Sequence, residues 1–136
     1  MSAHLLIQVW LLLSGLAFEA GQTRSNQARL IIYRPRDFGG GTYTININDH
    51  KLGKLPTNRY LQVDLPTGRI KIESARDYVT ENQILWIDAY PGRTYYVKGI
   101  EEIDFLSQML LLAPIGPEQA QRELPGLKPA SLPRPH

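Results

Sequence analysis

The stretch "YLQVDLPTGRIKIES", residues 60–74, decides the fold class because every second residue in each of its halves is apolar. A side-chain period of two marks a β-strand that buries one face and wets the other. At its centre, Pro66 presets φ for a turn, and Gly68 accepts the positive φ that a chain reversal can require. The stretch therefore predicts a β-hairpin with one wet face, whose inward residues are Leu61, Val63, Leu65, Ile70 and Ile72.

The same period recurs through most of the chain. "ARLIIYR" (28–34) is apolar on both faces, and "TYTININ" (42–48) and "KLGKL" (51–55) predict strands joined by a turn at Asp49 and His50. "QILWIDA" (83–89) is a nearly continuous apolar run, which is typical of a central strand, and "RTYYVKG" (93–99) alternates again. "SQMLLLAPI" (107–115) fits a strand or a helix end, and its leucine run before Pro114 favours the strand.

Seven to eight short, mainly antiparallel strands predict an all-β sandwich of the immunoglobulin or transthyretin type. Pro117 suits a first helical turn, so residues 117–124 predict a short C-terminal helix. Residues 125–136 hold four prolines and few apolar groups, which predicts an extended, disordered tail.

The N-terminus carries an apolar run, residues 5–18, which is shorter than the roughly 20 residues that a bilayer span needs. It predicts a signal peptide over residues 1–20, cleaved after Ala17 or Ala20. Because "MSAH" contributes no Lys or Arg, a buried element of the folded domain is the alternative. The expected organisation is a polar linker at 21–27 and a sandwich domain at 28–124, in a periplasmic or secreted protein, or in one that an uncleaved signal tethers.

The composition argues against several classes of function. The 136 residues suffice for one domain, and the net charge of +2 is spread along the chain, which argues against a nucleic-acid partner. Cysteine is absent, so disulfides, thiolate metal sites, cysteine nucleophiles and lipid-modified cysteine are excluded. We expect no cofactor, no metal, and no stable membrane span after signal cleavage.

Several segments together resemble a known bacterial family: "ARLIIYRP", "YTININDHKLGKL", "RYLQVDLPTGRIKI", "PGRTYYVKG" and "PEQAQREL". In their order and spacing they are similar to the domain-of-unknown-function family two-eight-four-six, many of whose members are described as envelope lipoproteins. The hairpin also resembles those of PEGA and carboxypeptidase-regulatory-like sandwiches. The resemblance covers residues 28–124 and implies a small envelope sandwich without assigned chemistry or site residues. Since this chain lacks a lipobox cysteine, it departs from the lipoprotein pattern.

The strongest candidate binding residues are tyrosines and arginines of the predicted strands. If Tyr60 and Tyr96 face outward near Arg59 and Arg93, the four residues would form a surface for a glycan or an envelope protein. Ordinary cross-strand packing is the alternative for the tyrosines.

The patterns that would indicate a catalytic or a metal-binding site are weaker than those for a binding surface. A hydrolase would have to use Asp88 and His50, but Asp88 also fits a structural ion pair or an exposed edge, and His50 fits a solvated turn. "NINDHK" (46–51) lacks the ligand spacing of a calcium loop. "FGGG" (38–41) has no helix behind it to hold a phosphate, and we interpret it as a flexible connector.

These observations favour a non-enzymatic, exported envelope protein that acts as a binding or structural module. One alternative is an interaction subunit that docks a partner through its Pro-rich tail or an exposed Tyr/Arg face. The other is the small periplasmic hydrolase. The identity of the ligand and the oligomeric state stay open.

Overall fold

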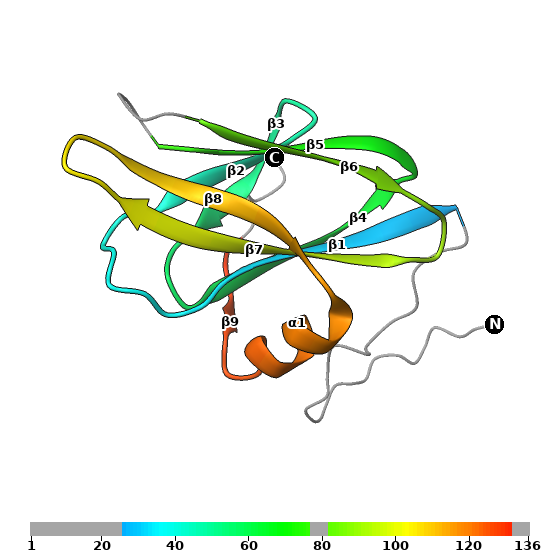
Figure 1. The fold of residues 1–136 in the computed structure, drawn as a ribbon. Coiled ribbons are helices and arrows are strands. Elements are labelled where there is room, and N and C mark those ends of the chain that lie inside the picture. Colours follow the sequence, from blue (N-terminus) through cyan, green and yellow to red (C-terminus); the bar gives the residue numbers. More distant parts are fainter. Residues whose placement is uncertain (1–25, 77–81, 132–136) are drawn as a thin grey trace.

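The structure is a computed structural model that describes residues 26–76 and 82–131. These residues form two stacked β-sheets and one short helix, which confirms the all-β sandwich with a C-terminal helix (Figure 1). The elements in chain order are β1 (Gln27–Arg34), β2 (Tyr43–Ile47), β3 (His50–Leu55), β4 (Arg59–Pro66), β5 (Gly68–Ala75), β6 (Gln83–Ala89), β7 (Thr94–Ile103), β8 (Gln108–Ile115), α1 (Pro117–Glu123) and β9 (Lys128–Pro129). The predicted signal peptide and residues 21–25 of the predicted linker lie outside the described residues.

The larger sheet has the strand order β8-β7-β1-β4-β9, and the smaller sheet has the order β3-β2-β5-β6. Strand β1 lies in the middle of the larger sheet, antiparallel to β4 and parallel to β7. Its residues Leu30 and Ile32 pack into the core between the sheets, while Ile31 and Tyr33 pack into a second core beneath α1. The prediction that this strand is apolar on both faces is therefore confirmed, because it is covered on both sides.

The stretch at residues 60–74 forms two strands, but the hairpin prediction is wrong. Strand β4 pairs with β1 in the larger sheet, whereas β5 pairs with β2 and β6 in the smaller one. The Pro66 to Gly68 corner, where Gly68 has φ +122°, therefore carries the chain from one sheet to the other. The expected inward residues do pack in the core between the sheets. Alternation specifies which face is buried, but it does not specify which strand lies alongside.

The hairpin between β2 and β3 is confirmed, with its turn one residue earlier than predicted. Asn48 and Asp49 form the two-residue loop with φ of 49° and 70°, a left-handed pair of the kind that tight hairpins favour. The Asn48 side chain also accepts a hydrogen bond from the backbone N–H of Lys71 at 2.9 Å, which ties the turn to β5. His50 is consequently the first residue of β3 and is exposed.

The prediction that residues 83–89 form a central strand is wrong, because β6 is an edge strand of the smaller sheet. Its burial alternates along the strand, with Ile84 and Trp86 about half exposed on the outer face. The apolar run reflects two apolar faces, of which only one is buried. The strand interpretation of residues 107–115 is confirmed by β8.

Helix α1 begins at Pro117, as predicted, and covers the outer face of the larger sheet with Ala120 and Leu124. It is fixed by Glu123, which accepts hydrogen bonds from the Tyr33 hydroxyl at 2.7 Å and from Lys98 Nζ at 3.1 Å. The hydrogen bond from Tyr33 holds the pKa of Glu123 below its usual range, and burial raises the pKa of Tyr33.

The expectation of a disordered tail is wrong for residues 125–131. Strand β9 runs parallel to β4, and the backbone N–H of Ala130 donates to the carbonyl of Tyr60 at 2.8 Å. Leu127 packs beneath α1, and Ala130 packs against the core between the sheets. The segment is extended, as expected, but these apolar contacts and the pairing with β4 give it a defined place. Residues 132–136 lie outside the described part of the chain.

Candidate functional site

Arg34, at the end of β1, is a fully buried cation at one end of the sandwich. Its Nε and Nη2 donate to the carboxylate of Asp37 at 2.8 and 3.0 Å, and Nη2 also donates to Glu101 Oε1 at 3.2 Å. Its Nη1 donates to the carbonyls of Gly41 at 2.7 Å and Leu55 at 3.1 Å. All five donors of the guanidinium are therefore used, which is what a buried charge needs to be tolerated.

Glu101, on β7, is the second buried charge of this cluster, since its side chain is 2% exposed. Its Oε2 accepts a hydrogen bond from the Tyr43 hydroxyl at 2.8 Å, while Oε1 accepts from Arg34. The guanidinium carbons of Arg34 and Arg76 lie 5.3 and 5.5 Å from the centroid of the Tyr43 ring, within cation–π range. Arg76 in turn donates to Gln108 on β8. The cluster thus joins β1, β2, β7 and β8 with the residue that follows β5.

Two groups of this cluster, Tyr43 and Asp37, have pKa values shifted away from neutral pH. Burial, and then the hydrogen bond to Glu101, raise the pKa of Tyr43 to about 12, so its hydroxyl stays a donor. Burial alone would raise the pKa of Asp37, but the hydrogen bond and the charge of Arg34, with help from the Thr57 hydroxyl, hold it below its usual range. Neither group is suited to proton transfer at neutral pH, so the role of the cluster is structural. We call this cluster, formed by Arg34, Asp37, Tyr43, Arg76 and Glu101, the lock.

The "FGGG" loop closes over this lock, and our interpretation of it as a flexible connector is wrong. A Cβ on Gly39 would lie 1.1 Å from Glu101 Oε1, and one on Gly41 would lie 2.4 Å from Arg76 Nη1. Only residues without a side chain allow the loop to approach the buried Glu101 carboxylate and the Arg76 guanidinium so closely. The loop is therefore pressed onto β7, and it leaves the Phe38 side chain fully exposed.

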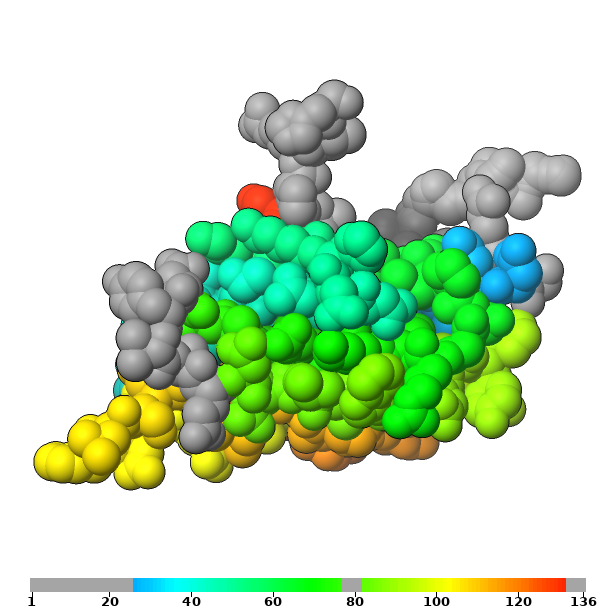
Figure 2. All heavy atoms as spheres, turned by 90° about the horizontal axis from the view of Figure 1, so that it is seen from above, coloured from blue at the N-terminus to red at the C-terminus, as the bar shows by residue number. Residues whose placement is uncertain are grey.

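Beyond the lock, the β7–β8 hairpin projects from the body of the molecule (Figures 1 and 2). Its tip is closed by a hydrogen bond from the N–H of Asp104 to the carbonyl of Ser107 at 2.8 Å. We call the exposed apolar side chains here the apolar end; they are Phe38, Ile103, Phe105 and Leu106, with exposed fractions of 106%, 60%, 94% and 89%. Phe38 is not part of the hairpin, but its neighbour Gly39 lies against the side chain of Glu101 on β7. Glu101 precedes Ile103 by two residues, so we include Phe38 in the apolar end.

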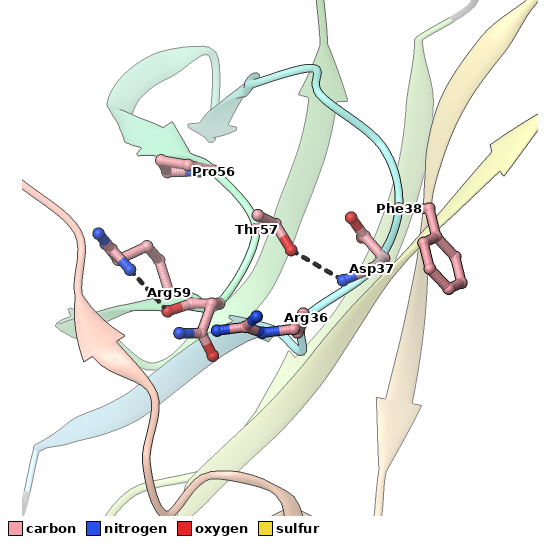
Figure 3. A pocket seen from close by; sticks show the side chains of 7 residues that line it. Arg36, Asp37, Phe38, Pro56, Thr57 and Arg59 are labelled. Atoms are coloured by element: carbon pink, nitrogen blue, oxygen red, sulfur yellow. Dashed lines mark hydrogen bonds between the residues drawn. The ribbon is translucent and has the colours of Figure 1, made fainter.

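A shallow hollow of about 710 Å³ adjoins the base of the apolar end (Figure 3). It is lined by Arg36, Asp37, Phe38, Pro56, Thr57, Asn58 and Arg59. The Thr57 hydroxyl accepts a hydrogen bond from the N–H of Asp37 at 2.9 Å, and Arg59 Nη1 donates to the carbonyl of Asn58 at 3.1 Å. One wall of the hollow is therefore fixed to the lock, and Phe38 is shared between the hollow and the apolar end.

The four predicted binding residues are not brought together as one exposed patch. Tyr60 and Tyr96 lie on the same face of the larger sheet, as predicted, but α1 covers that face and both rings pack beneath it. Arg59 is paired in register with Arg34, whereas the carbonyl of Arg93 accepts from the N–H of Arg29 near the other end of β1. The two arginines are therefore separated by about five residues of strand, roughly 17 Å.

The two residues of the hydrolase alternative are also far apart. His50 lies on β3 and Asp88 on β6, which are opposite edges of a four-stranded sheet, so about three strand spacings of roughly 4.8 Å separate them. Asp88 is 68% exposed and lies 3.8 Å from Arg69, which matches the expected edge position and ion pair. Asp49 pairs with Lys71 at 2.9 Å. Over residues 26–76 and 82–131, three or more potential metal ligands do not gather at any point.

The sequence held a signal for the apolar end that our reasoning missed. In "IEEIDFLSQ" (100–108), two large apolar residues stand between Asp104 and Ser107, which are turn formers. An apolar pair inside a turn is a signal of exposure, because the side chains of a turn point into the solvent. Phe38 carries the same signal, since it is followed by three glycines.

Comparisons of the chain with protein-family models, with curated proteins and with solved structures each found no match. The resemblance to the family two-eight-four-six therefore stays an expectation from the sequence. Within the described residues, none of the helices has the length and apolar character needed to cross a membrane.

Proposed function

We propose that this chain is an exported envelope protein and a non-enzymatic binding module that engages a protein partner through its apolar end. Export is supported by the apolar N-terminal run followed by a polar segment. The non-enzymatic character is supported by the wide separation of His50 and Asp88. It is also supported by the lock, in which Arg34 is already hydrogen-bonded to Asp37 and Glu101.

The observation that carries the proposal is the exposure of four large apolar side chains, three on the projecting hairpin and Phe38 on the loop packed against β7. Burying a fully exposed Phe or Leu contributes about 2 kcal/mol, so leaving several in water at one place forgoes a large gain. Contiguous exposed apolar surface of this kind marks an interaction site. The lock beneath it reduces the ordering cost on binding, because Phe38 and the base of the hairpin are already positioned.

The charges at the tip of the β7–β8 hairpin indicate what kind of partner fits there. Glu102 and Asp104 flank the hairpin tip, and both are exposed. Anionic lipid headgroups would be repelled by these carboxylates, whereas a protein recess with a basic rim would be attracted. The site therefore favours an apolar recess on another envelope protein.

The experiment is photo-crosslinking in intact cells of the source organism. A photoreactive amino acid at position 105 should give one discrete adduct, which mass spectrometry identifies, while the same probe at the exposed β4 residue Gln62 should give none. Loss of the position-105 adduct when Leu106 is changed to Asp would support the site. Equal labelling from positions 62 and 105, or recovery of lipid adducts alone, would refute a protein partner at the apolar end.

Export is tested separately by sequencing the N-terminus of the protein recovered from the cell envelope. We expect a new terminus at Phe18 or Gly21. An intact Met1 on protein found in the cytoplasm would overturn the location and leave the apolar end as a binding site to be tested there.

A further inference from the structure

The two sheets of the described chain end in four edge strands, β8 and β9 in the larger sheet and β3 and β6 in the smaller. The backbone N–H and C=O groups on the outer side of an edge strand can pair with a strand of another chain. Monomeric proteins block this with short strands, prolines, lysines or bulges. The four edges can therefore be compared by asking which of them carry such features.

Three edges are protected. Strand β9 has two residues, one of them Pro129, and β8 carries Pro114. Strand β3 carries Lys51 and Lys54, which are both exposed. Its pairing with β2 is interrupted by a register shift between Ile45 and Asn46 of β2. Each of these features interrupts or repels a continuous partner strand.

Strand β6 carries none of these features. Its seven residues, "QILWIDA", include no Pro, Gly, Lys or Arg, and they pair with β5 without a register shift. Ile84 and Trp86 are 51% and 48% exposed on the outer face. Strand β8 packs against β5 and β6 from the other sheet, so it belongs to the layer beneath β6. An apolar, unprotected edge of this length with an unbroken register is a pairing site.

We infer that β6 pairs antiparallel with β6 of a second copy of this chain, with Leu85 opposite Leu85 across the two-fold axis. In this register Ile84 stands opposite Trp86 twice, which is the aromatic and β-branched pairing that strands favour. The single carboxylate, Asp88, stands opposite the amide of Asn82. The smaller sheets of the two copies then form one continuous eight-stranded sheet.

The other symmetric registers fit less well. With Trp86 opposite itself, Asp88 faces Ile84, and with Ile87 opposite itself, Asp88 faces Trp86. In each of these two registers, the Asp88 carboxylate of either copy stands opposite an apolar side chain of the other copy, which is unfavourable. The guanidinium of Arg69 already lies 4.7 Å from the Trp86 ring centroid, so the indole is held in place on β6 before pairing.

The dimer would add to the proposed function by presenting two apolar ends, but the inference of a dimer does not depend on that function. Arg76, just after β5, contacts Gln108 at the start of β8, and β6 begins opposite the end of β5, so β6 starts on the side of the apolar end. Antiparallel pairing therefore directs the two apolar ends in opposite directions. A dimer of this form is bivalent.

Cysteine cross-linking tests both the contact and its register, because the natural chain has no cysteine. The full-length variants Ile84→Cys and Trp86→Cys, coexpressed and mildly oxidised, should form a disulfide-linked heterodimer, while each variant alone should stay largely monomeric on a denaturing gel. Strong cross-linking of Trp86→Cys alone would overturn the Leu85 register. No cross-link in any combination would overturn the dimer.

Sedimentation of the protein as purified gives an independent readout. We expect the mass of two chains and at least a tenfold weaker self-association for Trp86→Lys, with Gln62→Lys as the matched control on an exposed position of β4. Trp86 is about half exposed, so the substitution leaves the core between the sheets intact. A monomer at every concentration, or equal effects of the two substitutions, would contradict the inference. Neither result bears on cross-linking from position 105, so the two proposals fail separately.

Discussion

Replacing Gly39 with alanine is expected to destabilise the fold far more than the same change at the next residue. The new Cβ would lie 1.1 Å from Oε1 of Glu101 and 2.1 Å from its carboxyl carbon. The carboxylate has no free space to move into, because the Glu101 side chain is 2% exposed and both of its oxygens are engaged. The substitution therefore expels the carboxylate or displaces the loop.

The magnitude follows from the contacts that would be lost. Expelling Glu101 removes its hydrogen bonds from Arg34 at 3.2 Å and from Tyr43 at 2.8 Å. A hydrogen bond to a charged group contributes about 1.5–3 kcal/mol, and breaking a buried ion pair costs roughly 3–5 kcal/mol. We expect Gly39→Ala to lower the free energy of unfolding by about 3–5 kcal/mol, a large share of the roughly 5–15 kcal/mol typical of a domain.

Urea unfolding of the two alanine variants is the assay. A Cβ on Gly40 would meet nothing within 4 Å, so Gly40→Ala should change the free energy of unfolding by no more than about 0.5 kcal/mol. In a Glu101→Ala background the clash is removed, and Gly39→Ala should then cost little. Equal stability of the Gly39→Ala and Gly40→Ala proteins would refute the close packing of the loop on the lock.

Four further predictions concern alkaline pH, acidic pH, the C-terminal segment and the apolar end. Since folding raises the pKa of Tyr43 to about 12, stability should be lost between the ordinary tyrosine pKa of about 10 and that value, and Tyr43→Phe should reduce the loss. Since folding lowers the pKa of Asp37, stability should also fall as the pH drops below its ordinary value of 3.8, and less so in Asp37→Asn. Leu127→Ser should lower the melting temperature by several degrees, whereas Lys128→Ser, on an exposed residue of the same segment, should not. Phe105→Ser should leave urea stability within about 0.5 kcal/mol of the natural chain while abolishing partner capture; a large loss of stability would show that the tip is part of the core.

Much of the fold could be predicted because the side-chain period of two survives in most strands. What could not be predicted is which strands are neighbours. The pattern of Leu61 and Ile70 is the same whether β4 and β5 pair with each other or lie in different sheets, since both arrangements bury the same face. Likewise, the apolar run around Trp86 is compatible with a covered central strand or with an edge strand whose outer face stays apolar.

The candidate site was harder to predict because its parts are distant in sequence. Arg34 and Glu101 are 67 residues apart, and nothing local to either indicates that they meet. The tail was misjudged for a similar reason. The low apolar content of residues 125–136 suggested disorder, but Leu127 fills a specific place beneath α1 that exists only once the sheet and the helix have packed.

The most direct test of the central claim is the affinity of the purified protein for the partner that cross-links at position 105. Leu106 is 89% exposed in the free protein, so burying it in a recess should contribute about 2 kcal/mol. Calorimetry should therefore show binding weakened about tenfold or more by Leu106→Ser and unchanged by Gln62→Ser. Equal affinities for the natural chain and the Leu106→Ser variant would contradict a function based on the apolar end.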